Sequence, residues 1–193
     1  QRLADGSWSQ PVELGATLNT PYNETAPCLH ADLRTLIFAS EGHGAVGDMD
    51  LFVTTRLDDS RWDLWSAPVN LGKGICTSDR DCDIALSADG SKALITRRSN
   101  LSQDLFSVTL PPAVKPQPVV PVRGTVRNSN DEPVATAIRW EDPVTAQYIG
   151  ECRTNPKDGS FLFYLPTNQR YCCYVSDSLY LPESAVIDLS ESG

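Results

Sequence analysis

Three aspartates alternate along the stretch TSDRDCD, at Asp79, Asp81 and Asp83. Alternate residues of an extended strand share one face, and clustered carboxylates are ligands that calcium prefers. The spacing therefore makes these aspartates candidate calcium ligands. An EF-hand loop does not fit, because Ile84 stands where that loop requires glycine and Gly90 stands where it requires glutamate. The alternative is structural, with Asp81 bonding to backbone groups and the other two aspartates facing solvent.

Two histidines, His30 and His43, are the side chains that could act as a base near pH 7 without a large pKa shift. His30 is expected in a turn, and His43 lies in the glycine-containing loop SEGHGAVGDMD. The chain has neither a Gly-x-Ser-x-Gly elbow nor a Gly-x-x-x-x-Gly-Lys phosphate loop. Because no nucleophile is paired with a base, the sequence predicts a protein that is not an enzyme and needs no cofactor.

Four tryptophans could line a sugar-binding face, because an indole ring offers a flat apolar surface with one polar group. Trp8 and Trp65 recur at equivalent positions of a repeated phrase and are predicted to pack inside the fold. Trp62 and Trp140 do not recur, so they are the candidates for contact with a partner.

The elements that would position these residues form a repeat. WSQPVELG (residues 8–15) returns as WSAPVNLG (65–72), and two later segments return in register, TLIFAS (35–40) as KALITR (92–97) and DLFVTT (50–55) as DLFSVT (104–109). Acidic residues recur with them, and we expect structural roles for these pairs: Glu24 with Asp81, Asp32 with Asp89, and Asp50 with Asp104. A unit of about 55 residues with several short strands is typical of a propeller blade. Two blades cannot close a ring, so we expect the chain to be part of something longer.

A proline-rich stretch separates the repeat from a different pattern. LPPAVKPQPVVPV (residues 110–122) holds five prolines, which is typical of a semi-rigid spacer. Beyond it, residues 122–142 and 145–166 predict two hairpins, and further short strands favour a small β-sandwich. The predicted fold is all-β, a partial propeller followed by a Greek-key or transthyretin-like sandwich. The predicted boundaries are 1–110 for the propeller region, with units 8–55 and 65–109, then 111–121 for the linker and 122–190 for the sandwich.

Composition narrows the classes of partner. The net charge of −9 and the pI near 4.6 argue against a nucleic-acid partner, which requires a basic face. No apolar run approaches the ~20 residues of a membrane-spanning helix, and the N-terminal residues do not form a signal peptide. The six cysteines are either buried free thiols or pairs, with Cys76–Cys82 and Cys152 with Cys172 or Cys173 as the candidate pairs.

The repeated unit resembles the TolB-type, WD-like propeller repeat of outer-membrane proteins. That repeat reads WSxPVxLGxxINT, an acidic residue, a P-x-L-S-x-D-G turn, an L-Y-F-x-S strand and G-x-D-L-Y. The matching residues are Trp8/Trp65, Pro11/Pro68, Leu14/Leu71, Gly15/Gly72, Asn19, Glu24/Asp81, Pro27, Asp32/Asp89 and Asp50/Asp104. The second copy departs at Cys76 and Ile84 and has a shortened loop, RRSNLSQ, so it resembles a terminal blade.

The second half resembles a carboxypeptidase-regulatory-like domain in V-x-G-x-V (122–126), EPVATA (132–137), NPKDGSFLFYLP (155–166) and SAVIDLS (184–190). Despite its name, a domain of this kind does not imply peptidase activity. Propeller, proline spacer and sandwich in this order resemble OmpA-family, peptidoglycan-associated outer-membrane proteins, including the PorE-like component of type IX secretion. The resemblance implies a periplasmic location at the outer membrane of a Gram-negative bacterium. It also implies contact with peptidoglycan only through a domain absent from this chain.

These observations predict a non-enzymatic scaffold or docking fragment of the cell envelope whose partners are other envelope proteins. A carbohydrate- or peptide-binding module is the first alternative, favoured if Trp62 or Trp140 is exposed beside polar groups. The second alternative is an accessory propeller region of a hydrolase, which requires a catalytic domain elsewhere in a longer chain.

Overall fold

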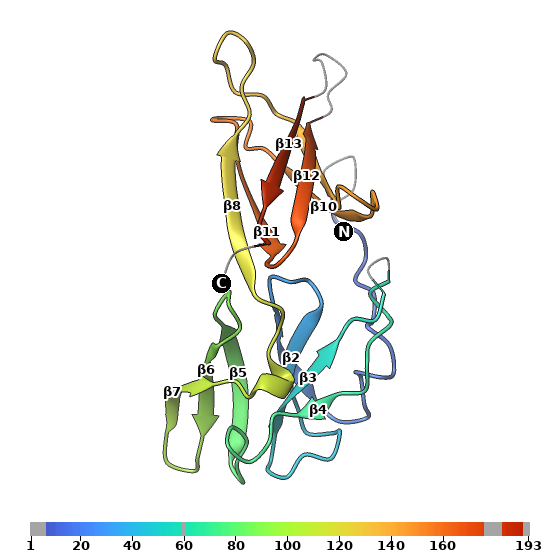
Figure 1. Ribbon diagram of the computed structural model, residues 1–193. Helices are drawn as coiled ribbons and strands as arrows, with labels where there is room; N and C mark the ends of the chain where they lie inside the picture. Colours follow the sequence, from blue (N-terminus) through green and yellow to red (C-terminus); the bar gives the residue numbers. More distant parts are fainter. Residues whose placement is uncertain (1–6, 59–60, 176–182, 191–193) are drawn as a thin grey trace. The chain divides into compact units, whose positions relative to one another are not determined.

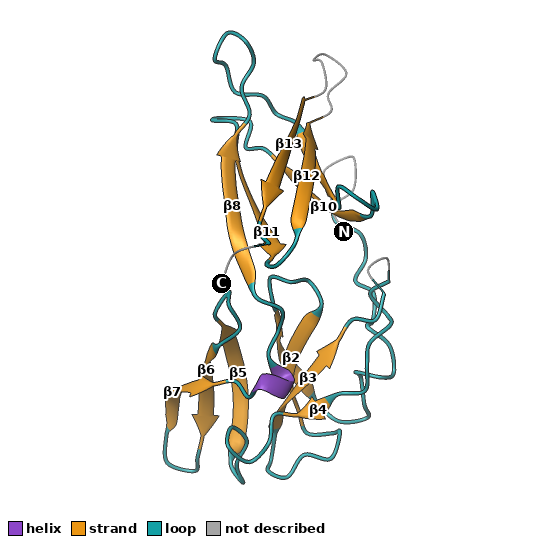
Figure 2. Cartoon of the chain, viewed as in Figure 1, coloured by secondary structure: helices purple, strands orange, loops and turns teal. Residues whose placement is uncertain are grey.

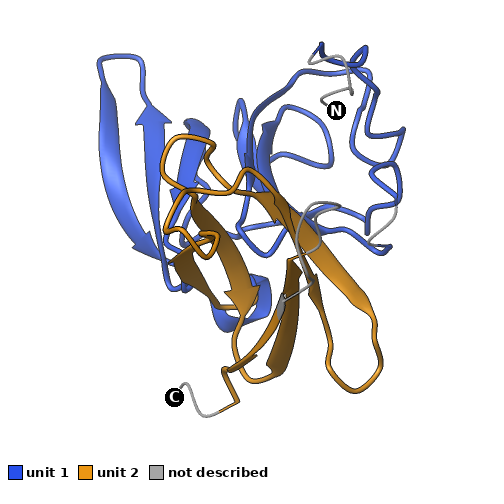
Figure 3. Cartoon of the chain, turned by 90° about the horizontal axis from the view of Figure 1, so that it is seen from above, with its two compact units in different colours: residues 1–116 blue, residues 117–193 orange. Residues whose placement is uncertain are grey.

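The computed structural model describes residues 7–58, 61–175 and 183–190 of the chain. The described residues form thirteen strands in open antiparallel sheets (Figures 1 and 2), which confirms the all-β prediction. Across these ranges the helical element is the three-residue turn η1 (Pro112–Val114), and no helix is long and apolar enough to cross a membrane. The chain divides into two compact units, Gln1–Pro116 and Gln117–Gly193 (Figure 3), with the boundary inside the proline-rich stretch.

The first sheet of unit 1 has the strand order β1-β2-β3-β4. Its strands are β1 (Glu24–Leu29), β2 (Thr35–Ser40), β3 (Asp50–Thr55) and the short β4 (Val69–Asn70). Every residue of β2, and all of β3 but its last, is buried. The two strands are covered on both faces, which explains why their sequences are nearly continuous apolar runs.

The second sheet of unit 1 contains β5 (Arg80–Leu86), β6 (Lys92–Arg98) and β7 (Gln103–Thr109) in that order. It packs on the first sheet through one apolar core that joins Ile37 and Leu51 of the first sheet to Ala93 and Ile95 of the second. A separate cluster on the other face of the first sheet contains Leu18, Leu36, Phe38, Phe52 and Trp65.

The sequence repeat is also a repeat of backbone conformation. Equivalent residues Ala26 and Asp83 have φ angles of 48° and 44° at register shifts in β1 and β5. The glycines that end the two phrases, Gly15 and Gly72, have φ angles of 93° and 85°. The second sheet differs in one respect, since no described strand takes the place that β4 has beside β3.

Unit 2 contains a four-stranded and a two-stranded sheet. The first has the order β10-β9-β12-β13, with bounds β9 (Ala137–Glu141), β10 (Tyr148–Arg153), β12 (Arg170–Val175) and β13 (Glu183–Asp188). The second pairs β8 (Val119–Thr125) with β11 (Ser160–Pro166). Both sheets contribute to one core, in which the Trp140 ring of β9 stacks on Phe163 of β11 with ring centroids 5.4 Å apart.

The two hairpins predicted in this half do not continue into their strands, and the first is limited to an antiparallel bridge between Arg127 and Pro133 across its turn. β8 pairs with β11 rather than with β9, and β10 pairs with β9 rather than with β11. The turns were placed correctly by their Asn, Pro, Asp and Gly residues, but a turn does not decide which strand becomes the neighbour. The shared core decides it, because Trp140 and Phe163 must face one another from different sheets.

The two copies of the repeat carry different residues at the same position of the turn before β2 and β6, so exchanging them tests backbone strain at that turn. Leu33 has φ = 56° where its equivalent Gly90 has φ = 64°, and a left-handed conformation is unfavourable for leucine. We expect Leu33→Gly to raise the free energy of unfolding by about 0.5 kcal/mol, since the relieved strain exceeds the entropy cost of glycine.

Gly90→Ala should lower the free energy of unfolding by about 1 kcal/mol or more, because the new Cβ meets Pro116 as well as the unfavourable φ. Urea unfolding of both variants measures the two changes. A destabilised Leu33→Gly variant would contradict the strain assigned to this turn.

Candidate functional site

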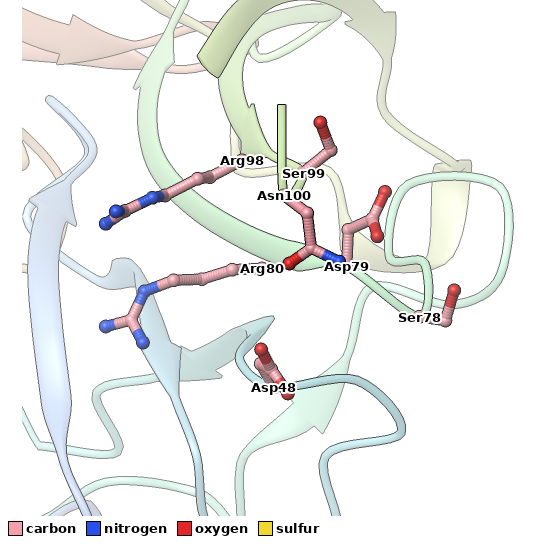
Figure 4. Close-up of a pocket in the computed structure, with 7 residues that line it drawn as sticks. All are labelled: Asp48, Ser78, Asp79, Arg80, Arg98, Ser99 and Asn100. Atoms are coloured by element: carbon pink, nitrogen blue, oxygen red, sulfur yellow. The ribbon is translucent and has the colours of Figure 1, made fainter. Parts of the chain in front are cut away.

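The candidate site is an open polar pocket of unit 1 with a volume of about 450 Å³. Three segments line it: the glycine-containing loop between β2 and β3, the start of β5, and the turn between β6 and β7. The lining residues are Asp48, Ser78, Asp79, Arg80, Arg98, Ser99 and Asn100 (Figure 4). Because loops tolerate sequence change while the sheets hold their ends in place, this is a typical location for recognition.

The glycine-containing loop can reach the start of β5 because Gly47 has no side chain. A Cβ at Gly47 would lie 2.5 Å from the Asp79 carbonyl oxygen and 2.6 Å from the Thr77 carbonyl oxygen, which is too close. Nearby, the Asp81 amide donates a hydrogen bond of 2.8 Å to the Met49 carbonyl. These close contacts fix the two walls of the pocket to one another.

Two arginines give the pocket its positive side. Arg80 and Arg98 are register partners on β5 and β6, and Figure 4 shows their side chains extending in the same direction. Arg80 donates a hydrogen bond of 3.2 Å to Glu41. Arg98 is exposed, and within the described ranges its guanidinium has no hydrogen bond or ion pair. An exposed planar guanidinium of this kind can bind a carboxylate or another oxyanion.

The sequence analysis missed Arg80, Arg98 and Asn100. The register of β5 against β6 brings the two arginines together, and only a correct strand pairing would have revealed it. The available signal was the shortened loop RRSNLSQ, which places Arg98 and Asn100 at the turn of the second sheet.

The three candidate calcium ligands do not share one face. β5 has a register shift between Cys82 and Ile84, where Asp83 adopts a φ of 44°, so the alternation of an extended strand is interrupted. Asp79 lines the pocket, Asp83 is exposed and Asp81 is fully buried. Within the described residues, no group of three acidic, histidine or cysteine side chains is placed to hold a metal ion.

Asp81 holds the strands of the second sheet. Its Oδ1 accepts a hydrogen bond of 2.7 Å from Arg97 Nε, and its Oδ2 accepts hydrogen bonds of 2.6 Å and 3.0 Å from the amide and hydroxyl of Thr77. Arg97 in turn donates to the Ile75 carbonyl at 2.8 Å. The structure therefore shows the hydrogen bonds to backbone groups that the structural interpretation of Asp81 predicted, and Asp81 also forms an ion pair with Arg97.

Glu24 does in the first repeat what Asp81 does in the second. Its carboxylate accepts hydrogen bonds from the Thr20 amide at 3.0 Å and hydroxyl at 2.7 Å, and from Ser40 at 2.8 Å. Burial alone would raise the pKa of Glu24, but these hydrogen bonds outweigh it and hold the pKa below its usual value. Ser40 occupies the position that Arg97 occupies in the second repeat.

The turn aspartates Asp32 and Asp89 also match. Asp32 accepts hydrogen bonds from the Thr35 amide at 2.8 Å and hydroxyl at 2.7 Å, and Asp89 accepts them from the Ser91 amide at 3.0 Å and hydroxyl at 2.7 Å. Each carboxylate closes the turn that leads into the central strand of its sheet.

The third pair of repeated acids, Asp50 and Asp104, differs. Asp50 is fully buried and accepts hydrogen bonds from the Val46 amide at 2.7 Å and from Asn70 of β4 at 2.9 Å. Asp104 is exposed and accepts a hydrogen bond of 2.7 Å from Ser102. The difference follows from β4, which has no described counterpart beside β7.

Both histidines have structural contacts. His30 is buried, with Nε2 3.1 Å from the Ala88 carbonyl oxygen and Nδ1 3.3 Å from Asp32 Oδ2, so it joins the turns of the two repeats. His43 lies 2.9 Å from the Leu18 carbonyl through Nε2, and its ring packs edge-on against Phe38.

The tryptophans differ from the expectations in two places. Trp140, a candidate partner contact, is fully buried in the core of unit 2 and presents no ring face to a partner. Trp8, expected to pack like Trp65, is 75% exposed where Trp65 is 4% exposed. Trp65 is covered because it bridges to Arg56 at the end of β3, in the first sheet. Trp62 is 47% exposed, with the Arg56 guanidinium 4.2 Å from its ring centroid.

All six cysteines are free thiols in the structure. Burial raises the pKa of the Cys76 thiol to about 11, and it raises the pKa of Cys28 and Cys152 as well. Because the thiolate is the reactive form, these cysteines are poor nucleophiles in the folded protein.

No protein-family model, curated protein or solved structure matches the chain. The resemblances to TolB-type repeats and to carboxypeptidase-regulatory-like domains therefore stay predictions. The all-β fold and the polar pocket are observations of this structure and do not depend on them.

The ion pair of Asp81 predicts a large loss of stability when its charge is removed. Asp81→Asn leaves the Arg97 guanidinium without its partner in a largely buried position, so we expect the free energy of unfolding to fall by about 3 kcal/mol. Asp63→Asn is the matched control, because Asp63 pairs with Arg61 at 2.8 Å on the exposed surface and should show no measurable change. Urea unfolding measures both, and equal effects of the two variants would argue against a structural role for Asp81.

The His30–Asp32 pair predicts a dependence of stability on pH. Burial alone would lower the pKa of His30, but the hydrogen bond and charge of Asp32 raise it above its usual value of 6.5. Burial alone would raise the pKa of Asp32, but hydrogen bonds from His30 and Thr35 hold it well below its usual range, so Asp32 stays ionised near neutral pH.

A raised folded-state pKa means that protonated His30 contributes its full stabilisation below the unfolded pKa of about 6.5 and loses it as pH rises through the folded pKa. We therefore expect urea unfolding of the wild type to lose stability from about pH 6 upward relative to His30→Gln. Parallel pH curves for the two proteins would show that folding does not raise the pKa of His30 and would contradict the stabilising role assigned to the pair.

Proposed function

We propose that the protein is a non-enzymatic docking module of the cell envelope, related to OmpA-family, outer-membrane-associated proteins. The observation that supports this proposal is that some polar residues of unit 1 serve the fold while others remain available at its surface. The repeated acids and His30 are held by internal hydrogen bonds, whereas Arg98 extends without a described partner at a loop-built pocket. A rigid sheet framework with a charged, open loop site suits recognition of another protein.

The finer architecture belongs to this proposal. Unit 1 would be two blades of a TolB-type propeller, supported by two sheets with the same bulge, turn and hydrogen-bonded acids. Unit 2 would be a Greek-key or transthyretin-like sandwich, supported by two sheets that share the core around Trp140. Residues 111–121, which span the boundary between the two units and include the start of β8, would act as a proline-rich spacer.

The pocket fits an acidic side chain or a chain-terminal carboxylate of a partner protein. Arg98 would donate two hydrogen bonds to the carboxylate, while Asn100 offers both a donor and an acceptor beside it. Asp48 and Asp79, which line the same pocket, would select a basic group at a second point of the same partner. The partners would be periplasmic or outer-membrane proteins, and peptidoglycan would be reached through a domain outside this chain.

Binding of a carbohydrate or a peptide is the second candidate function, and the exposed ring of Trp62 favours it. One face of that ring is covered by Arg56, so a sugar would stack on the other face. An accessory role beside a hydrolase would require a catalytic domain elsewhere in a longer protein.

Site-specific photo-crosslinking in the native cells tests the proposal. A photo-reactive amino acid would replace Asn100 at the pocket, Trp62 on the second candidate surface, or Val144 as an exposed reference position of unit 2. We expect Asn100 to crosslink to a periplasmic or outer-membrane protein. Arg98→Glu should weaken that crosslink about fivefold, as the loss of an exposed ion pair worth about 1 kcal/mol predicts.

Arg61→Glu is the matched control, because Arg61 is an exposed arginine of the same unit outside the pocket, and this variant should leave the crosslink unchanged. Crosslinks to cytoplasmic proteins would contradict the envelope location. Glycan crosslinks from Trp62 with none from Asn100 would replace docking by carbohydrate binding.

A further inference from the structure

The second sheet of unit 1 ends in a strand whose residues are exposed almost throughout. Six of the seven residues of β7 are exposed, and the remaining one, Val108, is half-buried. Leu105 is 78% exposed and Phe106 is 40% exposed, so large apolar side chains are among them. β7 lies at the outer side of its sheet (Figure 1), and no other described strand pairs with it there. An edge strand of this kind is a template for the addition of another strand.

The edge of β7 lacks the features that commonly prevent such addition. The strand pairs with β6 over seven residues without a register shift, so it has no bulge. It contains neither lysine nor proline, which are the residues that most often protect an edge. The corresponding strand of the first sheet, β3, is paired on both sides, with β2 and with β4.

The backbone groups of β7 that point away from β6 belong to alternate residues. At the two ends of the pair, the Leu110 amide donates to the Ser91 carbonyl at 3.1 Å, and the Ser102 carbonyl accepts from the Ser99 amide at 2.9 Å. Bonded residues alternate along an antiparallel pair, so the even-numbered residues of β7 bond to β6. The outward amides and carbonyls are those of Gln103, Leu105, Ser107 and Thr109.

These outward groups are placed symmetrically about Phe106, the middle residue of β7. If two copies of β7 lie antiparallel with their Phe106 residues opposite one another, Leu105 faces Ser107 and Gln103 faces Thr109 in both directions. Every outward amide and carbonyl then has a partner, because residues of a bonded pair exchange both hydrogen bonds. A shift of one residue would set outward groups against inward ones, and a shift of two would leave an end residue unpaired.

The side chains also fit this register. It sets Leu105, a large residue, against Ser107, a small one, twice across the two-fold axis. Ser107 is itself opposite Leu94 of β6, which is 56% exposed. Leu94 of one copy and Leu105 of the other therefore flank Ser107 and can cover it, which gives one apolar row of four leucines. Asp104 is the one charged residue of β7 and would face Val108, so no like charges are opposed within the strand pair.

Phe106 would lie on the two-fold axis. There it forms a pair without backbone hydrogen bonds, which is the type that brings side chains closest, and aromatic pairs across strands are stabilising. The Arg97 guanidinium lies 4.9 Å from the Phe106 ring centroid. This contact holds the ring of each copy from one side, so the ring is already positioned for its counterpart.

We propose that the protein forms a two-fold symmetric dimer in which the β7 strands of two copies pair antiparallel about Phe106. Both copies use the same surface, so the contact is isologous and the assembly stops at two. The three-stranded sheets of the two copies become one six-stranded sheet. The contact uses neither the pocket residues nor the cell envelope, so it holds or fails independently of the proposed function.

Sedimentation analysis of the 193-residue chain from about 10 µM to about 1 mM tests the association. A single strand pair lies below the roughly 1,200 Å² of a stable interface, so we expect a dissociation constant on the order of 100 µM. The mass should rise to that of a dimer and no further, and added salt should increase the dimer, because each copy has a net charge of −9 and salt screens the repulsion. A chain that stays monomeric at about 1 mM in high salt, or a mass that grows beyond a dimer, would overturn the proposal.

A charge on the edge strand should block the dimer. Leu105→Lys places a lysine in the apolar row, and we expect the dissociation constant to rise about tenfold or more. Val144→Lys is the matched control, because Val144 is an apolar residue of unit 2 that is 87% exposed, and this variant should dimerise as the wild type does. Each variant makes the net charge less negative, so a general charge effect would strengthen both dimers. Equal dimerisation of the two variants would overturn the assignment to β7.

A self-crosslink tests the register and the symmetry together. Opposed Phe106 positions would have Cα atoms about 4.5 Å apart, within reach of a disulfide, so Phe106→Cys should crosslink to a second copy of itself under mild oxidation. Thr109→Cys is the control at the end of the same strand. Its two copies would be offset by six residues, about 20 Å along the strand pair, and should not crosslink. The wild type measures the background from the native thiols. Equal crosslinking of the two variants would overturn the register.

Discussion

The packing of the second sheet on one face of the first is the contact on which unit 1 depends. Ile37 and Leu51 meet Ala93 and Ile95, so the contacting faces are different faces of the same repeated unit. A contact of this kind has a necessary consequence. It leaves the outer face of the second sheet uncovered, where Leu94 is 56% exposed and Leu105 is 78% exposed.

The polar residues of the repeat serve this packing. Two β-sheets stay stacked only if their strands and turns hold their places, and short loops alone do not ensure that. Asp81 joins β5 to β6 through Arg97, and His30 joins the turn of the first repeat to the Ala88 carbonyl in the turn of the second. Residues whose types suggested metal binding or general-base chemistry are thus occupied by the fold. The pocket residues Arg98 and Asn100, at the loop ends, are not tied down in this way.

The parts of the fold that the sequence predicted are those encoded by local pattern. The repeat is visible because Trp65 copies Trp8, and the structural roles of Glu24, Asp32, Asp81 and Asp89 follow from their recurrence. Local sequence pattern did not predict the structure where the choice of neighbouring strand decides it. The neighbours of β8 and β10 depend on the shared core, and Trp140 lies inside that core although nothing in its immediate sequence distinguishes it from an exposed indole. The sequence did not predict the candidate site for the same reason, since Arg80 and Arg98 are brought together only by the register of β5 and β6.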